Sequence, residues 1–255
     1  MLAYNNNKKI KQEYLKRVKN HQKADELVHG RYWDGGKGCA VGCTIHSSQH
    51  IRYETELGIP QVIAHLEDRI FEGLSLKASQ QWPLKFLTVI KPGADLSMVW
   101  PRFCRWMLGD KKVGMIKYAA TNNRVVAAIN QVLDIYDGWI NKGVVDKSAA
   151  ESAARSARSA AWSAESAARS AAESAAWSTA SAARSAAESA TESAAWSATE
   201  SATESAAWSA ASAARSAAES AAWSAAWSAA KEKHYLIMSK KLLQFLKEAP
   251  ITKEK

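Results

Sequence analysis

The sequence predicts an all-α protein, with a multi-helix globular head followed by a long Ala/Ser-rich helix. In residues 1–147, apolar residues recur mostly at spacings of three and four, which is typical of helices. Outside residues 113–118, we find no alternation of polar and apolar residues with period two, the pattern of a half-buried strand. Residues 148–230 contain only Ala, Ser, Glu, Trp, Arg and Thr, and Ala is the strongest helix former.

Composition divides the chain into three parts: a head at 1–146, a repeat stalk at 147–230, and a C-terminal cap helix with its tail at 231–255. The head is long enough to bury a core. The expected large core residues are Trp82, Trp100, Trp106 and Trp139.

Three helices are expected in the first half of the head, at residues 8–29, 44–57 and 61–72. Gly30, Gly58 and Gly73 end them, and Pro60 suits the start of the third. Between the first two helices, four glycines in residues 31–42 predict a loop.

The expected elements of the second half are helices at 83–90, 95–108 and 121–140 and a strand at 113–118. Asp95 is expected to cap the second of these helices, because its side chain can accept hydrogen bonds from free backbone N–H groups. The last helix has an apolar face that runs along its whole length.

The repeat is an array of x-Ser-Ala-Ala units in which x is usually Glu, Arg or Trp. Its serines, from Ser148 to Ser228, span 80 residues in 21 intervals, so the mean period is about 3.8 residues against ~3.6 for an α-helix. Each column of equivalent residues therefore drifts around the helix in the right-handed sense. A partner that follows one column must wrap in a right-handed supercoil. Between Gly143 and Pro250 no Gly or Pro interrupts a helix.

Six tryptophans share the x column with Glu and Arg: Trp162, Trp177, Trp196, Trp208, Trp223 and Trp227. An Ala/Ser surface offers little apolar area, so packing on it depends on close approach of the backbones. We expect self-association or a protein partner, with the tryptophans as anchors. A solvated spacer is one alternative, and a helix that folds back on itself or on the head is another.

Residues 231–248 return to an ordinary amphipathic pattern. They are expected to cap the repeat, as terminal segments of repeat arrays do, or to dock on a neighbour.

The net charge of +9 is distributed unevenly: it separates into +8 for residues 1–147, −3 for 148–230 and +4 for 231–255. Nucleic-acid binding through the basic head is therefore one alternative function.

Composition also excludes several classes of protein. No run of about 18 apolar residues occurs, so neither a membrane span nor a membrane partner is expected. The first residues lack an apolar signal core, which predicts a cytoplasmic protein, and three cysteines form no disulfide framework.

One segment of the head concentrates reactive side chains that suit zinc. The candidate ligands are Cys39, Cys43, His46, His50 and Glu54. On one helix the two cysteines and two histidines would spread over ~16 Å, too far for one ion. The glycines beside the cysteines predict that the thiols lie in the loop instead, while His46 and His50, four apart on a helix, form a bidentate pair. No cofactor is assigned beyond this zinc candidate.

The same segment offers a nucleophilic cysteine, because a thiol before a helix start is favoured as thiolate. The candidate catalytic residues are Cys39, Cys43 and His46; His50 and His65 are further candidate bases, and Asp34 or Glu54 a candidate orienting group. The segment does not match a zinc-protease helix, since Ser47 stands where that motif has its Glu. A packed pair of buried thiols with no chemistry is the alternative.

The GKGCAVGCTIH loop, the ETELGIP segment and the x-Ser-Ala-Ala array resemble those of uncharacterised bacterial and phage open reading frames. The resemblance implies a bacterial cell or a phage-infected one as the setting, and it implies no activity and no site residue. From the residues we predict a non-enzymatic helical assembly or partner-binding protein that uses the repeat for oligomerisation or spacing. The alternatives are a metal- or Cys/His-dependent enzyme with its site at residues 39–54, and the nucleic-acid binder.

Overall fold

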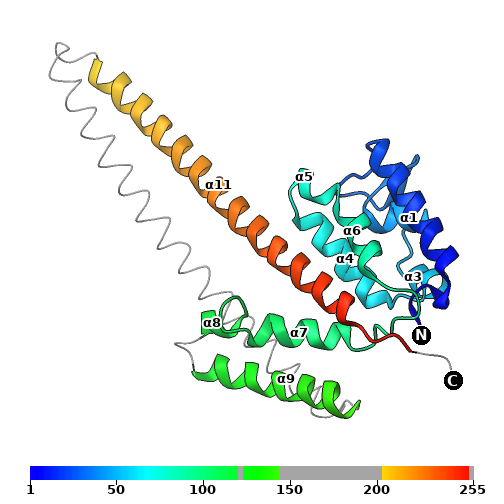
Figure 1. Ribbon diagram of the computed structural model, residues 1–255. Helices are drawn as coiled ribbons and strands as arrows, with labels where there is room; N and C mark the ends of the chain where they lie inside the picture. The colour runs from blue at the N-terminus through cyan, green and yellow to red at the C-terminus, as the bar shows by residue number, and fades with distance from the viewer. Residues whose placement is uncertain (120–122, 144–202, 253–255) are drawn as a thin grey trace. The chain divides into compact units, whose positions relative to one another are not determined.

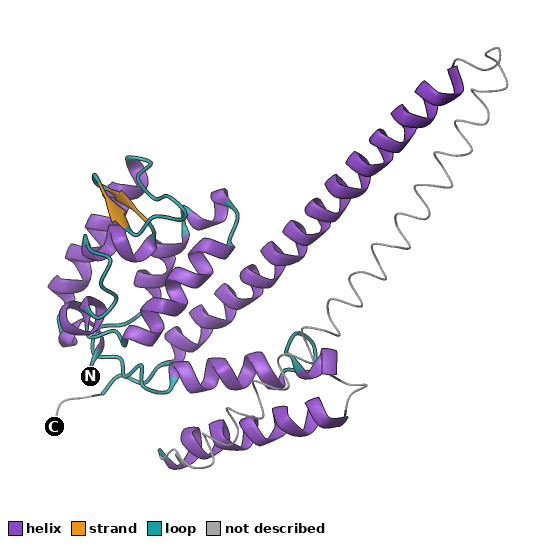
Figure 2. Cartoon of the chain, turned by 180° about the vertical axis from the view of Figure 1, so that it is seen from behind, coloured by secondary structure: helices purple, strands orange, loops and turns teal. Residues whose placement is uncertain are grey.

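The computed structural model describes residues 1–119, 123–143 and 203–252, and in this part of the chain the secondary structure is helical except for one two-stranded hairpin, with loops and turns between the elements (Figures 1 and 2). The predicted all-α class is confirmed. The chain forms two compact units, one made of Met1–Ala157 together with Lys231–Lys255, the other of Arg158–Ala230. Arg158–Ala230, which is most of the repeat, therefore lies in the sequence between two parts of one unit, which we call the head unit.

The first part of the head unit contains η1 (Ala3–Asn6), α1 (Lys8–Lys23), β1 (Trp33–Asp34), β2 (Lys37–Gly38), α2 (Ala40–Ile45), α3 (Arg52–Leu57) and α4 (Gln61–Gly73). It continues with α5 (Leu76–Ser79), α6 (Trp82–Val89), α7 (Val99–Gly109), α8 (Ile116–Ala119) and α9 (Asn123–Lys142). One helix, α11 (Thr203–Glu248), contains the last part of the repeat and most of the C-terminal segment.

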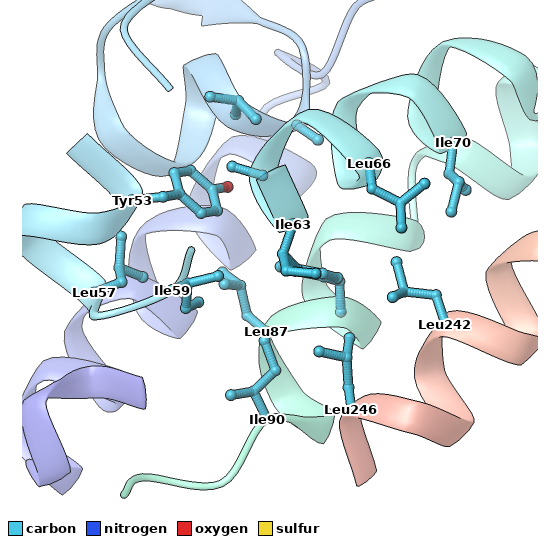
Figure 3. Close-up of a cluster of buried hydrophobic side chains, with 14 of the residues drawn as sticks. Tyr53, Leu57, Ile59, Ile63, Leu66, Ile70, Leu87, Ile90, Leu242 and Leu246 are labelled. Carbon is cyan, nitrogen blue, oxygen red and sulfur yellow. The ribbon is translucent and has the colours of Figure 1, made fainter. Parts of the chain in front are cut away.

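Helix α4 lies at the centre of the head unit and is buried on most of its circumference. Its apolar side chains pack with those of α3, α6 and the end of α11, as Figure 3 shows. Leu242 of α11 lies beside Leu66 and Ile70 of α4, and Leu246 lies near Ile90 (Figure 3). Leu242 and Leu246 are both fully buried.

Backbone hydrogen bonds also connect the N-terminal and C-terminal segments to the turn after α6. Ala3 N donates to Ala94 O at 2.9 Å, and Asp95 N donates to Pro250 O at 2.8 Å. Residues 231–252 therefore belong to the fold of the head unit, by hydrogen bonding as well as by side-chain burial.

Several predicted elements are confirmed and others are wrong. The helices predicted at 61–72, 83–90 and 121–140 correspond to α4, α6 and α9. The strand predicted at 113–118 is wrong, because Asp110 turns the chain there by accepting hydrogen bonds from the backbone N–H groups of Lys112 and Val113. Asp95 does not cap a helix; its carboxylate accepts from Ser97 N, and α7 starts at Val99.

The helix predicted at 44–57 is also wrong. The chain forms two short helices, α2 and α3, separated by residues 46–51. His46 ends α2 in the left-handed conformation, with φ 50° and ψ 44°. The first helix starts where predicted but ends at Lys23, because Asp25 takes a positive φ of 56° and residues 26–28 pair with Gly38.

Of the four tryptophans expected in the core, Trp82 is buried and donates its indole N–H to Glu67 O at 3.0 Å. Trp100 and Trp106 are half-buried against the core, and Trp139 is half-buried on α9. Within the described residues, no helix has the length and apolarity to cross a membrane.

The described part of the repeat, residues 203–230, is helical as predicted. Trp208, Trp223 and Trp227 lie on this helix. Trp162, Trp177 and Trp196 lie outside the described residues, as does most of the predicted right-handed drift.

Candidate functional site

The candidate segment begins where the hairpin crosses the start of α2. Gly38 and Gly42 lie under the backbone of Tyr32: a Cβ built on Gly42 would be 1.5 Å from the Tyr32 carbonyl oxygen, and one on Gly38 would be 2.1 Å from it. Cys39 N donates to Arg31 O at 2.7 Å in the same contact. The two glycines are therefore required by close backbone approach, and Gly42 lies inside α2 rather than in a loop.

The two cysteines face different surroundings. Cys39 lies beside the carboxylate of Asp68 from α4, whereas the Cys43 thiol lies 3.4 Å from Gly38 O and 3.5 Å from Glu26 O. Burial raises the pKa of Cys43 to about 12, and burial with the Asp68 charge raises the pKa of Cys39. Both thiols are free and protonated at neutral pH, which is the opposite of an activated nucleophile.

We expect these thiols to react slowly with alkylating reagents in the native protein. Burial both blocks access to Cys39, Cys43 and Cys104 and suppresses their thiolate forms. Labelling with iodoacetamide at pH 7.5, followed by mass spectrometry, should modify all three only after urea is added. One cysteine labelled as fast as a free thiol in the native state would contradict this expectation.

His46 and His50 do not form the predicted bidentate pair, because the break after α2 sends them to different clusters. We call the first the His50 cluster: His50, His65, Asp68, Cys39 and Tyr32. We call the second the His46 cluster: His46, His21, Glu26 and Trp33. Glu54 belongs to neither, since its Oε1 accepts from Gln61 N at 2.9 Å and so satisfies the first turn of α4.

The His50 cluster has a buried histidine–carboxylate pair at its centre. His50 Nε2 lies 3.6 Å from Asp68 Oδ2, and both side chains are buried. The His50 ring stacks on that of exposed His65, with centroids 4.0 Å apart and planes 18° apart. Burial and the neighbouring His50 charge lower the pKa of His65. Tyr32 covers His50 edge-on, with ring centroids 5.5 Å apart.

Beneath this cluster, Glu67 of α4 is fully buried beside the hydroxyl of Tyr53. Within the described residues neither carboxylate oxygen nor the Tyr53 hydroxyl has a partner in hydrogen-bonding geometry. Burial raises the pKa of Glu67 well above its usual range, and the adjacent Asp68 charge adds to this. Burial therefore favours the protonated acid of Glu67 over its carboxylate in the folded protein.

We expect Glu67→Gln to remove a pH dependence of stability. Because the pKa of Glu67 is higher in the folded than in the unfolded protein, the contribution of Glu67 to stability falls as the pH rises above about 4.5, by up to about 1.4 kcal/mol per pH unit until the folded-state pKa is passed. Gln cannot ionise, so the stability of the variant relative to wild type should increase as the pH rises above about 4.5. Urea unfolding at each pH measures this, with exposed Glu13→Gln as the control; parallel curves for wild type and Glu67→Gln would contradict it.

The His46 cluster is a chain of short polar contacts at the protein surface. Glu26 Oε2 lies 2.5 Å from His21 Nδ1, and His21 Nε2 lies 2.8 Å from His46 Nε2. Trp33 of β1 stacks on His46 with centroids 4.5 Å apart and planes 15° apart, and it meets His21 edge-on. Burial, then the charges of Arg17, His21 and Arg52, lower the pKa of His46, which is therefore neutral at neutral pH.

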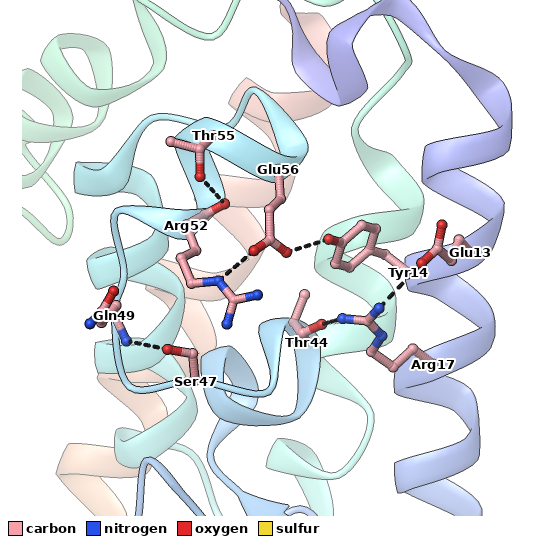
Figure 4. Close-up of polar contacts among 9 residues, drawn as sticks. All are labelled: Glu13, Tyr14, Arg17, Thr44, Ser47, Gln49, Arg52, Thr55 and Glu56. Atoms are coloured by element: carbon pink, nitrogen blue, oxygen red, sulfur yellow. Dashed lines mark hydrogen bonds and ion pairs between the residues drawn. The ribbon is translucent and has the colours of Figure 1, made fainter.

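Polar contacts between α1, α2 and α3 hold this cluster in place (Figure 4). Arg17 of α1 donates to Thr44 O at the end of α2 at 2.9 Å, two residues before His46. Tyr14 of α1 donates to Glu56 Oε2 at 2.5 Å, and Arg52 pairs with the other oxygen of Glu56.

Chemically, neither cluster matches the predicted site. In the described ranges, no group of three or more His, Cys, Asp or Glu side chains is arranged to hold a metal ion. Sequence reasoning missed His21, Glu26 and Asp68, which come from α1, the segment after it, and α4. Their spacing along the chain contains no signal, because each meets its partner only in the folded state.

Compared with known proteins, the chain matches no family model, no curated protein and no solved structure.

Proposed function

We propose that this protein is a non-enzymatic assembly protein in which the Ala/Ser/Trp repeat mediates association between copies of the chain. The observation that supports this most is that Arg158–Ala230, most of the repeat, forms a unit of its own between two parts of the head unit in the sequence. A segment inserted in this way is joined at both ends to one folded unit. Its sequence can vary, and it can associate with other copies of the chain, without disturbing that unit.

The helical register of the described repeat supports a contact surface. At ~100° per residue, positions 208, 223 and 227 of α11 lie within about 100° of one another around the helix axis. Ala and Ser occupy nearly all the remaining positions from 205 to 230. Small residues let two helices approach closely, and tryptophans at a contact bury large apolar area.

The chemistry of the head unit favours this function over the enzyme alternative. Cys39 and Cys43 are buried with raised pKa values, so neither is a ready nucleophile. Glu54, a candidate ligand and orienting group, is already bound to the backbone of α4.

The test compares the mass of the intact chain, 27.8 kDa as a monomer, with that of two variants by light scattering over a range of concentrations. In one variant all six repeat tryptophans become Ala. In the matched control, six glutamates of the same column become Ala: Glu151, Glu165, Glu173, Glu188, Glu204 and Glu219.

We expect the intact chain and the glutamate variant to form oligomers, and the tryptophan variant to be monomeric. A monomeric intact chain at every concentration would overturn the proposal, as would a tryptophan variant that keeps the full oligomer mass. Truncation before the repeat is unsuitable, because it also removes Leu242 and Leu246 from the head core.

A further inference from the structure

We propose that His21 and His46 form a two-histidine binding site for a borderline divalent transition-metal ion, of the class of Ni²⁺, Cu²⁺ and Zn²⁺, with water completing the coordination. The site is independent of the proposed assembly function. It differs from the ligand set expected from the sequence, from which it keeps only His46.

The two ring nitrogens already point at each other across a short gap. His21 Nε2 and His46 Nε2 are 2.8 Å apart. Two imidazoles that share a tetrahedral ion at ~2.0–2.1 Å from each nitrogen are about 3.3 Å apart. To take up an ion, the two rings must therefore separate by about half an ångström and tilt so that both Nε2 lone pairs converge on it.

Glu26 supplies the second interaction that metal-binding histidines typically have. Its Oε2 lies 2.5 Å from His21 Nδ1, and an Nδ1–H donated to this carboxylate leaves the Nε2 lone pair of His21 for an ion. The backbone places Glu26 there: Asp25 turns the chain with a φ of 56°, and Glu26 N donates to His21 O at 3.0 Å.

His46 is held equally firmly. It ends α2 with a left-handed backbone, the conformation in which many helices end and one in which His, like Asn and Asp, is enriched among residues other than Gly. Trp33 stacks on its ring and also contacts the ring of His21, so one indole fixes both imidazoles. The site is therefore preorganised from α1, β1 and the end of α2.

The exposure of the site and the chemistry of its ligands determine which metal ion can bind. His46 is exposed, so an ion and its waters can reach the two nitrogens, whereas the His21 side chain is 11% exposed. Imidazole ligands select borderline transition metals over Ca²⁺ and Mg²⁺, which prefer oxygen. Arg17 and Arg52 near His46 are engaged by Thr44 and Glu56, and their charge disfavours a dication, so we expect a reversible site rather than a permanent one.

The experiment titrates the full chain with Ni²⁺ alone by calorimetry, and compares His21→Gln, His46→Asn and Glu26→Gln. Asn tolerates the left-handed conformation at position 46 but has no imidazole. His65→Gln is the matched control, because His65 is an exposed histidine stacked on another ring outside this site. Thermal unfolding followed by circular dichroism verifies that each variant is folded.

We expect one Ni²⁺ per chain, loss of at least tenfold in affinity for His21→Gln and His46→Asn, and a 10–100-fold loss for Glu26→Gln. His65→Gln should bind as wild type does. With Cu²⁺, electron paramagnetic resonance should show two coordinating nitrogens in wild type and one in His46→Asn. Absence of Ni²⁺ binding, or folded His21→Gln and His46→Asn variants that bind within twofold of wild type, would overturn the proposal.

Discussion

Replacing Gly42 by Ala is expected to destabilise the head unit by about 3 kcal/mol or more, at the upper end of what overpacking costs. The new Cβ would lie 1.5 Å from the Tyr32 carbonyl oxygen and 2.6 Å from its carbon. These are backbone atoms, so no side-chain rotation relieves the clash; the hairpin must move away from α2. That movement breaks the contact in which Cys39 N donates to Arg31 O.

Gly138→Ala on α9 is the matched control, because a Cβ there meets nothing within 4 Å. In a helix with open space, Ala is favoured over Gly by roughly 0.5–1 kcal/mol, so this variant should be slightly more stable than wild type. Urea unfolding followed by near-UV circular dichroism measures both. If the two substitutions had effects of similar size, the proposed packing of the hairpin on α2 would be wrong.

Leu242→Ala and Leu246→Ala are each expected to cost about 2–5 kcal/mol, the usual range for a buried leucine. Both side chains are fully buried, and Figure 3 shows them among the apolar residues of α4 and α6. A loss of stability of this size would not be expected if residues 231–248 were only a cap at the far end of the repeat. It is expected here because this part of α11 completes the core of the head unit.

Lys247→Ala, an exposed position on the same turn of α11, provides the comparison and should change stability by less than about 0.5 kcal/mol. The free energies come from urea unfolding of the full chain. Equal, small effects for Leu242, Leu246 and Lys247 would mean that the C-terminal segment does not contribute to the core. Hydrogen exchange gives an independent measure, since amides of residues 238–246 should exchange as slowly as those of α4.

The sequence predicts a helix well where the apolar residues of its local pattern are the residues that the fold buries. Helix α4 follows Pro60, and its apolar residues face the core on several sides, so its bounds can be read from the chain. The predicted helix at 44–57 fails for a different reason. His46 leaves the helical conformation where the end of α2 is held by Arg17, an interaction 27 residues away in sequence.

The candidate site could likewise be predicted only in part from the sequence. The segment around Cys39, Cys43, His46 and His50 contains the polar clusters of the head, as its composition indicates. Which partner each residue meets depends on other elements: Asp68 for Cys39 and His50, and His21 for His46. Spacing within one segment cannot reveal these partners.

From the sequence alone, the helical class, the repeat and its helical continuation through residues 203–230 could be determined, because periodicity and helix propensity are local properties. Only the tertiary structure decided that residues 231–252 belong to the head unit, and that two glycines lie under Tyr32. An amphipathic pattern predicts that one face of a helix is buried, but it does not identify the element that covers this face. Long-range packing selects the partner, and here it joins residues 231–252 to the head unit, so that Arg158–Ala230 lies between two parts of that unit in the sequence.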